Sequence, residues 1–443
     1  MQLKFHSTTL KRIGIWLKND LRIRENPLID SAIRNGFEII PFYCLHPGFH
    51  IKSTIGMYRM GFFRTKFLFE TLKELDSSFR SKGSGVLFRY EDPVTAIPEL
   101  VKYYGIETVY LSDEFAPEEL SLILQVEQLL VKLSCRLVRT HPELLLPLRL
   151  QPYLPQAIPE VFTVYRQKAE KIVIPECDFS ESDFIASPEL PELILPSPGS
   201  IFVEAGDSFN FSSDSRFSFK AGEQAAHEQL HEYSFVSDRL AVYKETRNGL
   251  LGNHFSSRLS AWLSNGTLSA SQVYKKVKDY ERSRLANEST YWLVFELRWR
   301  DFFRLTMLQR AKQMFALNGF RKHAGAPDGK NMDLFNRWKN GQTGQDFVDA
   351  CMLELASTGY LSNRGRQIAA SYLVDYLKLD WRLGAAWFEQ ELVDYDASSN
   401  WGNWAYIAGV GNDPRGKRVF NPERQAELYD PDGSYRKYWL SKH

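Results

Sequence analysis

The sequence predicts two domains of different class: an α/β N-terminal domain with a Rossmann-like, doubly wound parallel sheet, and an all-α C-terminal domain. At 443 residues the chain is too long for one ordinary core. Short apolar runs alternate with amphipathic segments at first, a proline-rich acidic stretch follows, and beyond Phe219 apolar and aromatic residues recur at spacings of three and four. We therefore expect domains at 1–146 and 219–443, joined by a linker at 147–218.

Five short runs in the first domain have the composition of buried strands. They lie at residues 12–17, 37–45, 85–90, 108–112 and 136–140. Each is nearly all apolar, and helix-like segments separate them, which is typical of a parallel sheet covered on both faces. Ligands of such sheets bind beyond the carboxyl ends of the strands. Because the chain contains neither a GxGxxG nor a GxxxxGK[ST] loop, an ordinary dinucleotide or P-loop site is not favoured.

The linker combines breaks in regular structure with negative charge. Its nine prolines between 147 and 198 disfavour helix and central strand. Residues 175–215 hold nine acidic side chains and no Lys or Arg, so the rest of a chain whose net charge is +1 carries +10. A basic body is compatible with a polyanionic partner, and equally with an ordinary solvated surface.

The composition and the N-terminus exclude several classes of protein. No apolar run approaches the roughly 20 residues that cross a bilayer, and the N-terminus has no small-residue cleavage site. We therefore expect a cytoplasmic protein. The cysteines are far apart and form no CxxC pair, which fits packing roles in a reducing compartment. They are Cys44, Cys135, Cys177 and Cys351.

One segment spells a zinc motif. His227-Glu228-Gln229-Leu230-His231 matches HExxH, which on a helix places two imidazoles on one face for Zn²⁺ with Glu228 as general base. No third ligand follows at metalloprotease spacing, and the surrounding segment has the pattern of an ordinary amphipathic helix. A zinc hydrolase is thus an alternative, and a solvated helix face is the favoured interpretation.

Two segments of the second domain could bind a ligand. Glycine and asparagine hinges beside hydroxyls and cations, at residues 243–260, resemble a phosphate cradle, although a capped helix start has the same composition. Further on, Glu296 and Arg300 share a helix face with Trp299 beside them. Acid, cation and ring could hold a nucleobase, or form a plain ion pair over a buried tryptophan.

Polar and aromatic groups also interrupt helical stretches where a core would place Leu and Ile. They occur at residues 358–367, 394–396 and 400–406. Such breaks in local consistency are expected at functional sites.

Taken together, these segments resemble the photolyase and cryptochrome family, most closely its cryptochrome DASH branch. The resemblance covers nearly the whole chain. Its motifs are WLKNDLRIRENPL (16–28), YKETRNGLLG (243–252), FELRWRDFFR (295–304), TGYLSNRGRQ (358–367), DWRLGAAWFEQELVDYDASSNWGNWAYIAGVGNDPR (380–415) and FNPERQAELYDPDG (420–433). It implies an antenna-bearing α/β domain and a helical domain that holds FAD in a U-shaped conformation.

The resemblance also implies roles for individual residues. Asn363 would face the reactive flavin nitrogen. The diphosphate would be surrounded by Tyr243, Ser256, Ser257, Arg258, Leu259 and Ser260, and the isoalloxazine ring by Arg366, Asp394, Tyr395 and Asp396. A folate antenna such as 5,10-methenyltetrahydrofolate is expected, with Glu114 or Glu118 as candidate contacts, although surface charge explains both glutamates equally well.

On the substrate side the resemblance implies that Glu296 and Trp299 contact a pyrimidine dimer. Arg300, Arg364 and Gln425 are further candidates for binding DNA. Tyr406 lies where duplex-active photolyases usually carry a second tryptophan. The smaller ring offers less stacking energy to offset extraction of a dimer from a duplex, which favours single-stranded substrates.

Photoreduction in the family runs along a chain of tryptophans. Trp404 and Trp381 match its inner members, whereas residues 320–333 contain no tryptophan for the outer position. Trp338 or a surface tyrosine could substitute, or photoreduction could be slow. Together with Glu296 and Asn363, the two inner tryptophans form the expected catalytic set.

The leading hypothesis is therefore a light-driven enzyme. It would repair cyclobutane pyrimidine dimers, preferentially in single-stranded DNA, by electron transfer from photoexcited FADH⁻. The alternative is a blue-light photoreceptor that binds nucleic acid without repair. We expect a monomer whose partner is DNA, with RNA as a further candidate.

Overall fold

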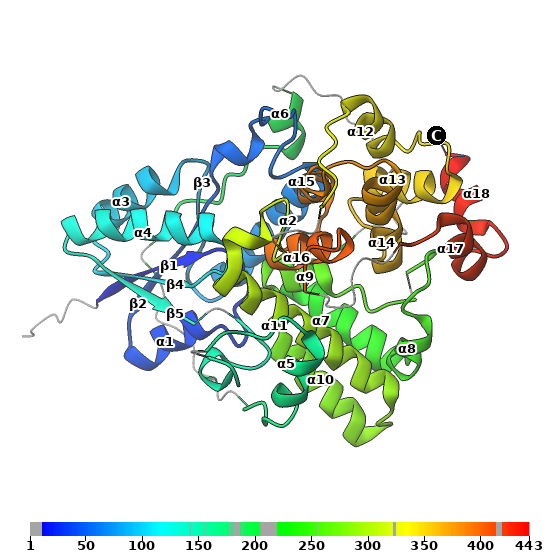
Figure 1. Ribbon diagram of the computed structural model, residues 1–443. Coiled ribbons are helices and arrows are strands. Elements are labelled where there is room, and N and C mark those ends of the chain that lie inside the picture. The colour runs from blue at the N-terminus through cyan, green and yellow to red at the C-terminus, as the bar shows by residue number, and fades with distance from the viewer. Residues whose placement is uncertain are drawn as a thin grey trace, which may run out of the picture.

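The computed structural model describes residues 11–141, 143–154, 156–176, 179, 187, 189–203, 219–253, 255–321, 325–412 and 419–442 (Figure 1). Five strands form one sheet near the N-terminus. They are β1 (Arg12–Leu17), β2 (Glu38–Cys44), β3 (Leu87–Arg89), β4 (Thr108–Ser112) and β5 (Arg136–Thr140). All five predicted strands are confirmed, and each lies within its predicted run.

The sheet is entirely parallel, with the strand order β3-β2-β1-β4-β5. The central strand β1 pairs through Ile15 with Pro41 on one side and with Tyr110 on the other. Alternate side chains of β1 enter different cores, because successive residues of a strand point to opposite faces. Ile15 joins one core cluster and Trp16 joins another. The predicted doubly wound α/β domain is therefore confirmed.

Two pairs of helices cover the two faces of this sheet. One core cluster contains residues of α1 (Pro27–Asn35) and α2 (Phe62–Arg80), and the cluster on the other face contains residues of α3 (Pro93–Tyr104) and α4 (Pro117–Lys132). Such crossover helices let parallel strands lie side by side. The carboxyl ends of β1, β2 and β4 then face the helical domain.

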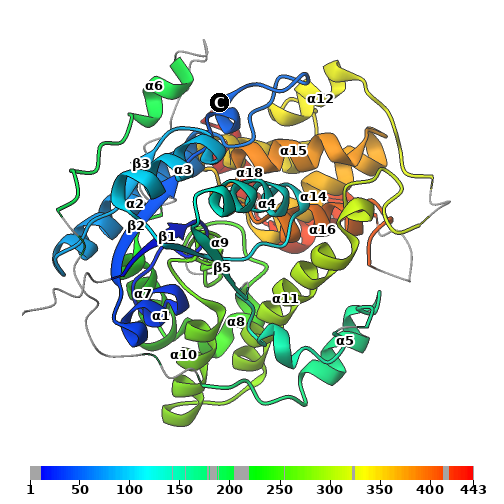
Figure 2. The same cartoon turned by 90° about the vertical axis from the view of Figure 1, so that its left-hand side faces the viewer.

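The linker contains more regular structure than its prolines predict. A helix, α5 (Phe162–Ala169), forms between Pro159 and Pro175 and lies along α11 in both Figure 1 and Figure 2. A shorter helix, α6 (Pro198–Val203), packs against α2. The expectation of an irregular connection was wrong for these two segments, because buried residues such as Phe162 offset a poor local propensity. Much of the acidic run, with Cys177, lies outside the described residues.

The rest of the described chain is helical. Its helices are α7 (Glu223–His231), α8 (Tyr243–Thr246), α9 (Ser260–Asn265), α10 (Ala270–Ser283), α11 (Glu288–Met314), α12 (Met332–Lys339), α13 (Asp346–Thr358), α14 (Asn363–Ser371), α15 (Trp381–Glu391), α16 (Ala397–Ile407), α17 (Pro422–Tyr429) and α18 (Ser434–Leu440). Short helical turns precede or follow some of them, at Pro47–His50, Leu148–Leu150, Glu232–Val236, Arg239–Val242 and Tyr372–Tyr376. None of the helices in the described ranges is long and apolar enough to cross a membrane.

The longest helix, α11, forms the centre of the helical domain. Buried residues lie all around its circumference, as they do on core helices. Asp301 of this helix is 1% exposed, and its carboxylate accepts the backbone N–H groups of Leu145 and Leu146, both at 2.9 Å. Burial raises the pKa of Asp301 to about 6, although these two hydrogen bonds oppose the shift. A buried carboxylate therefore joins the end of the α/β domain to α11.

Candidate functional site

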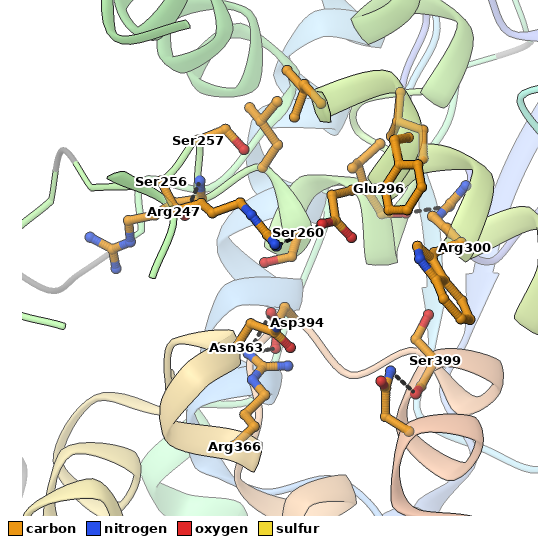
Figure 3. A pocket seen from close by; sticks show the side chains of 18 of the residues that line it. Arg247, Ser256, Ser257, Ser260, Glu296, Arg300, Asn363, Arg366, Asp394 and Ser399 are labelled. Atoms are coloured by element: carbon orange, nitrogen blue, oxygen red, sulfur yellow. Dashed lines mark hydrogen bonds and ion pairs between the residues drawn. The ribbon is translucent and has the colours of Figure 1, made fainter. Parts of the chain in front are cut away.

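The main cavity, of about 440 Å³, lies among α8, the segment 255–260, α11, α14 and α16. Figure 3 shows side chains of these elements around one common space. Residues far apart in sequence therefore meet here. Those that the sequence predicted are Tyr243, Ser256, Ser257, Arg258, Leu259, Ser260, Glu296, Trp299, Arg300, Asn363, Arg366, Asp394 and Tyr406.

One end of the main cavity is rich in hydroxyl groups. Ser256, Ser257 and Ser260 line it, and Arg258 occupies a left-handed backbone conformation with φ of 53°. The Arg258 guanidinium lies 4.3 Å from the ring centre of Phe219 and donates to Asn253 Oδ1 at 2.5 Å. Hydroxyls beside a cation suit an anionic ligand such as a diphosphate.

The opposite end carries a tightly held ion pair. Arg366 Nη2 donates to both carboxylate oxygens of Asp394, at 2.9 and 2.8 Å, and its Nε donates to the carbonyl of Leu361 at 2.8 Å. Asn363 begins α14, whose N-cap residue Ser362 accepts a backbone N–H within the helix. A fixed cation, a carboxylate and an amide thus line a second polar end, which fits the edge of a heteroaromatic ring.

A side hollow of about 90 Å³ shares several of these residues, including Asn363, Arg366 and Asp394. Tyr395, Asp396 and Trp404 line the side hollow and not the main cavity. Two residues predicted beside the cofactor, Tyr395 and Asp396, and one predicted inner tryptophan, Trp404, thus border the side hollow.

Glu296 lies in the α11 wall of the main cavity. Arg247 Nη1 donates to its carboxylate at 2.8 Å, and Trp292 Nε1 donates to it at 3.1 Å. Burial raises the pKa of Glu296, while Arg247 and the Trp292 hydrogen bond lower it. The ion pair between Glu296 and Arg300 that the helical spacing allowed does not form, because Arg300 turns to the carbonyl of Leu263 at 2.8 Å.

Arg300 has unused hydrogen-bonding capacity. Its Nη1 is buried and has no hydrogen-bond partner among the described residues. Burial, together with the nearby Arg304 cation, lowers the pKa of Arg300 to about 10. A buried donor at the cavity wall is costly unless it is paired, so the site fits a ligand that accepts a hydrogen bond here.

Trp299 contacts two phenylalanine rings. Phe162 of α5 stacks on it with ring centres 3.7 Å apart at 16°, and Phe303 lies 5.5 Å away at 28°. The predicted stacking residue therefore lines the cavity with one ring face covered by the linker helix. Tyr406, from α16, lines the same cavity.

Arg364 and Gln425 do not line the main cavity. Arg364 donates to Asn248 Oδ1 at 3.1 Å and to Gln425 Oε1 at 3.5 Å, and its guanidinium lies 4.4 Å from the Tyr429 ring centre. The two predicted DNA-binding residues are therefore close together, at a separate place from Glu296.

Sequence reasoning missed several residues of the main cavity. They are Arg247, Tyr360, Gln367, Ser399 and Asn403. Arg247, Tyr360, Gln367 and Asn403 belong to the predicted segments 243–260, 358–367 and 400–406, and Ser399 directly precedes the last of these. The sequence thus indicated the segments but not these individual side chains.

The inner tryptophans are deeply buried. Trp404 is 2% exposed, and Trp381 is 0% exposed with its Nε1 donating to the carbonyl of Leu317 at 2.9 Å. Trp338 is also fully buried, and its ring lies 6.2 Å from that of Trp404, so it is not a surface-exposed outer member. The half-buried ring of Trp401 lies 5.8 Å from that of Trp381.

An interdomain cavity of about 200 Å³ lies where the carboxyl ends of β1, β2 and β4 face the helical domain. Glu114 lines it, pairs with Lys18 at 3.2 Å and accepts from Asn19 at 3.2 Å. Glu118 does not line it and forms an ion pair with Arg59. Between the two candidate antenna contacts, only Glu114 therefore borders this space.

The zinc motif falls on α7, as expected for an amphipathic helix. His231 stacks on Phe235, with ring centres 5.6 Å apart. In the described part of the chain, no group of three or more His, Cys, Asp or Glu residues could hold a metal ion. The segment forms an amphipathic helix, with Leu230 buried and Glu228 and His231 exposed.

Comparison with known proteins agrees with this geometry. Residues 13–188 match the family described as DNA photolyase, and residues 292–443 match the FAD binding domain of DNA photolyase. The chain is 39% identical to a cryptochrome DASH of Gloeobacter violaceus, over 97% of this chain and 85% of that protein. It is 40% identical to a cryptochrome DASH of Danio rerio, over 96% and 82%.

Solved structures give the same result. The Synechocystis sp. PCC6803 cryptochrome superposes with a TM-score of 0.91 at 38% identity, covering 98% of this chain and 89% of that one. A class III photolyase from Agrobacterium tumefaciens has a TM-score of 0.83 at 23% identity, covering 99% and 88%, and shows the fold alone. The helical half is an FAD-binding domain. The chain belongs to the photolyase and cryptochrome family, in its cryptochrome DASH branch.

Proposed function

We propose that this protein repairs cyclobutane pyrimidine dimers in light, preferentially in single-stranded DNA. One observation carries the proposal. The main cavity brings Glu296, Trp299 and Tyr406, which suit a nucleobase, to the same space as the Arg366–Asp394 pair. Cofactor and lesion would thus meet within one cavity. We take the protein to act as a monomer in the cytoplasm.

The lining of the main cavity fits FAD. The serine hydroxyls at residues 256–260 would hold the diphosphate, and Asn363 with the Arg366–Asp394 pair would border the isoalloxazine ring. Bound FAD, once reduced and excited by light, supplies the electron that splits the dimer. The residues of this chain bind, orient and exclude water, and none needs to act as a nucleophile.

Glu296 is the residue that would recognise the lesion. Its carboxylate can accept a hydrogen bond from a pyrimidine N–H, and this interaction is stronger in a partly buried site than in water. The unpaired Nη1 of Arg300 offers a donor on the same wall. A dimer that reaches this wall must leave the base stack, which costs a few kcal/mol in a duplex and much less in a single strand.

The single-strand preference rests on Tyr406. Base stacking on an aromatic side chain contributes about 1 to 3 kcal/mol per base, and a phenol ring offers less area than an indole. One face of Trp299 is already covered by Phe162. With limited stacking surface, the binding energy would not offset extraction from a duplex.

The interdomain cavity suits a folate antenna such as 5,10-methenyltetrahydrofolate. It lies at the carboxyl ends of parallel strands, where ligands of α/β domains bind. Glu114 borders it and would accept hydrogen bonds from the pterin. Its wall shares Tyr395 and Asp396 with the side hollow, which would place antenna and flavin on two sides of the same residues.

The test is repair of an oligonucleotide that contains one thymine dimer. Reduced protein under blue light should restore undamaged thymines in the single strand faster than in the duplex. Glu296→Gln should lower repair by about tenfold to a hundredfold, as expected for loss of a charged hydrogen bond, with FAD still bound. If neither form is repaired while light still alters binding to nucleic acid, the protein is a photoreceptor and the proposal fails.

A further inference from the structure

Trp292 lies one helical turn before Glu296 on α11, outside the residues that line the main cavity. Its indole Nε1–H donates to Glu296 Oε1 at 3.1 Å. Arg247 Nη1 donates to the same oxygen at 2.8 Å. Two donors thus converge on one oxygen of the carboxylate.

The ring of Trp292 also contacts cations. The Arg247 guanidinium lies 5.0 Å from the ring centre, and Lys244 Nζ lies 5.1 Å from it. Both distances are within the range of cation–π attraction. Trp292 therefore contacts both members of the Glu296–Arg247 ion pair, one through its N–H and the other through its ring.

This arrangement leaves the two oxygens of Glu296 unequal. Oε1 receives both donors, and the described residues supply no hydrogen bond to Oε2. Because Glu296 lines the main cavity, Oε2 is the oxygen available to a ligand there (Figure 3). A carboxylate whose rotation is restrained from one side presents its other oxygen in a defined direction.

We propose that Trp292 is a positioning residue that fixes the Glu296–Arg247 pair, so that Glu296 Oε2 accepts an N–H of the extruded pyrimidine. The inference deepens the proposed function and rests on it. Trp292 does not touch the lesion. It acts through Glu296 alone, and its effect therefore depends on that carboxylate.

Several charged or titratable groups share the main cavity with Glu296 or contact its partner Trp292, and each of them can affect the pH profile of binding. Tyr243, Lys244 and Arg247 come from α8 and the residue after it, and Arg300 comes from α11. The other groups come from the remaining walls of the cavity: Arg258, Tyr360, Arg366 and Asp394. Burial raises the pKa of Tyr243, so this phenol stays neutral. Glu296 remains the group whose charge is set by burial, Arg247 and Trp292.

The experiment measures binding in the dark. A fluorescent single-stranded oligonucleotide with one thymine dimer is titrated with the FAD-loaded protein between pH 5 and 8.5, for wild type and Trp292→Phe. The phenylalanine keeps an aromatic face for Arg247 and removes the N–H. We expect Kd to rise about threefold to tenfold at neutral pH, with FAD content unchanged.

The pH dependence gives a second readout. Removing a donor to the carboxylate raises the pKa of Glu296, so the acceptor is lost at a higher pH as the solution is acidified. The acid limb of the binding profile should therefore move up by about 0.5 to 1 pH unit. Tyr291→Phe is the matched control, because Tyr291 lies on the same turn but bonds to Glu170 and Arg166. It should keep the wild-type profile.

A double substitution separates positioning from folding. In the Glu296→Gln background Trp292→Phe should have little further effect on Kd, whereas a merely structural role would add its full effect there. An unchanged Kd and acid limb in Trp292→Phe, or full additivity with Glu296→Gln, overturns the inference. The proposed function would instead be contradicted if the wild type did not bind dimer-containing strands more tightly than undamaged strands, or if it did not repair them.

Discussion

Arg304 and Asp396 form a buried ion pair between α11 and the start of α16. Arg304 Nη2 and Nε donate to Asp396 Oδ2 at 2.7 and 3.2 Å. The other carboxylate oxygen caps α16 by accepting the backbone N–H of Ser399 at 2.8 Å. Asp396 lines both the interdomain cavity and the side hollow. The pair thus holds the partition between two candidate cofactor sites.

Asp396→Asn should destabilise the protein in a pH-dependent manner. Burial opposes the charge of Asp396, but Arg304 and Arg300 outweigh it and hold its pKa below the ordinary 3.8. The pair therefore stabilises the fold above about pH 4, and this contribution is lost as the pH falls through the lowered pKa. The asparagine keeps a capping oxygen but leaves the buried Arg304 cation without its carboxylate partner, which should cost about 3 kcal/mol.

Urea unfolding of wild type and Asp396→Asn between pH 3 and 7.5 checks this. The difference in unfolding free energy should be constant above about pH 5 and should shrink below pH 4. A difference that stays constant down to pH 3 would contradict the assignment.

Photoreduction should depend on Trp404 and Trp381 and not on Trp338. Trp338 is fully buried beside Trp404, with its indole N–H donated to the carbonyl of Ala369 at 3.0 Å, and it offers no contact with solvent. Trp381→Phe and Trp404→Phe should each slow the bleaching of oxidised flavin in the presence of a thiol. Trp338→Phe is the control and should bleach at nearly the wild-type rate; equal slowing in all three variants would refute the assignment.

Tyr406→Trp should widen the substrate range. A larger ring adds stacking energy within the 1 to 3 kcal/mol available per base, which is enough to raise duplex repair about tenfold. Repair of single strands should change less, because little extraction energy is needed there. The measurement is the ratio of duplex to single-strand repair rates. Tyr406→Phe tests the hydroxyl alone and should leave this ratio as it is in wild type.

Folate content should depend on Glu114 and not on Glu118. Glu114 borders the interdomain cavity directly, whereas Glu118 lies outside its lining and reaches the cavity only through its ion pair with Arg59, which does line it. Glu114→Gln should weaken binding of 5,10-methenyltetrahydrofolate about tenfold, by loss of a charged hydrogen bond. Absorption spectra after reconstitution give the occupancy. A Glu118→Gln variant that loses folate to the same extent would reverse the assignment.

Much of the fold was predictable because its signals are local. The run RIGIWL at 12–17 has strand composition over its whole length, and β1 forms there. Helix α5 was not predicted, because its stability comes from tertiary contacts such as the stacking of Phe162 on Trp299. The helix propensity of the local sequence does not reflect such a tertiary contact, so it could not predict this helix.

The segments that form the candidate site were predictable from the sequence, but the ion-pair partner of Glu296 was not. Spacing allowed Glu296 to pair with Arg300, yet Arg247 takes that place from an element 49 residues away. A helical pattern specifies which side chains share a face. It cannot specify which cation another segment brings to that face. Of the two donors on Glu296 Oε1, Trp292 lies four residues earlier on the same helix, whereas Arg247 comes from a different segment.

The bonds from Leu145 and Leu146 to the carboxylate of Asp301 bear on how substrate enters. A hinge motion that moved the α/β domain away from α11 would break both hydrogen bonds to the buried carboxylate of Asp301. The free-energy cost of leaving that carboxylate without partners opposes such a motion. We therefore expect the two domains to keep a fixed orientation relative to each other and to move as one rigid body. The damaged bases of the DNA must therefore enter a preformed cavity, and binding does not require the two domains to close around the substrate.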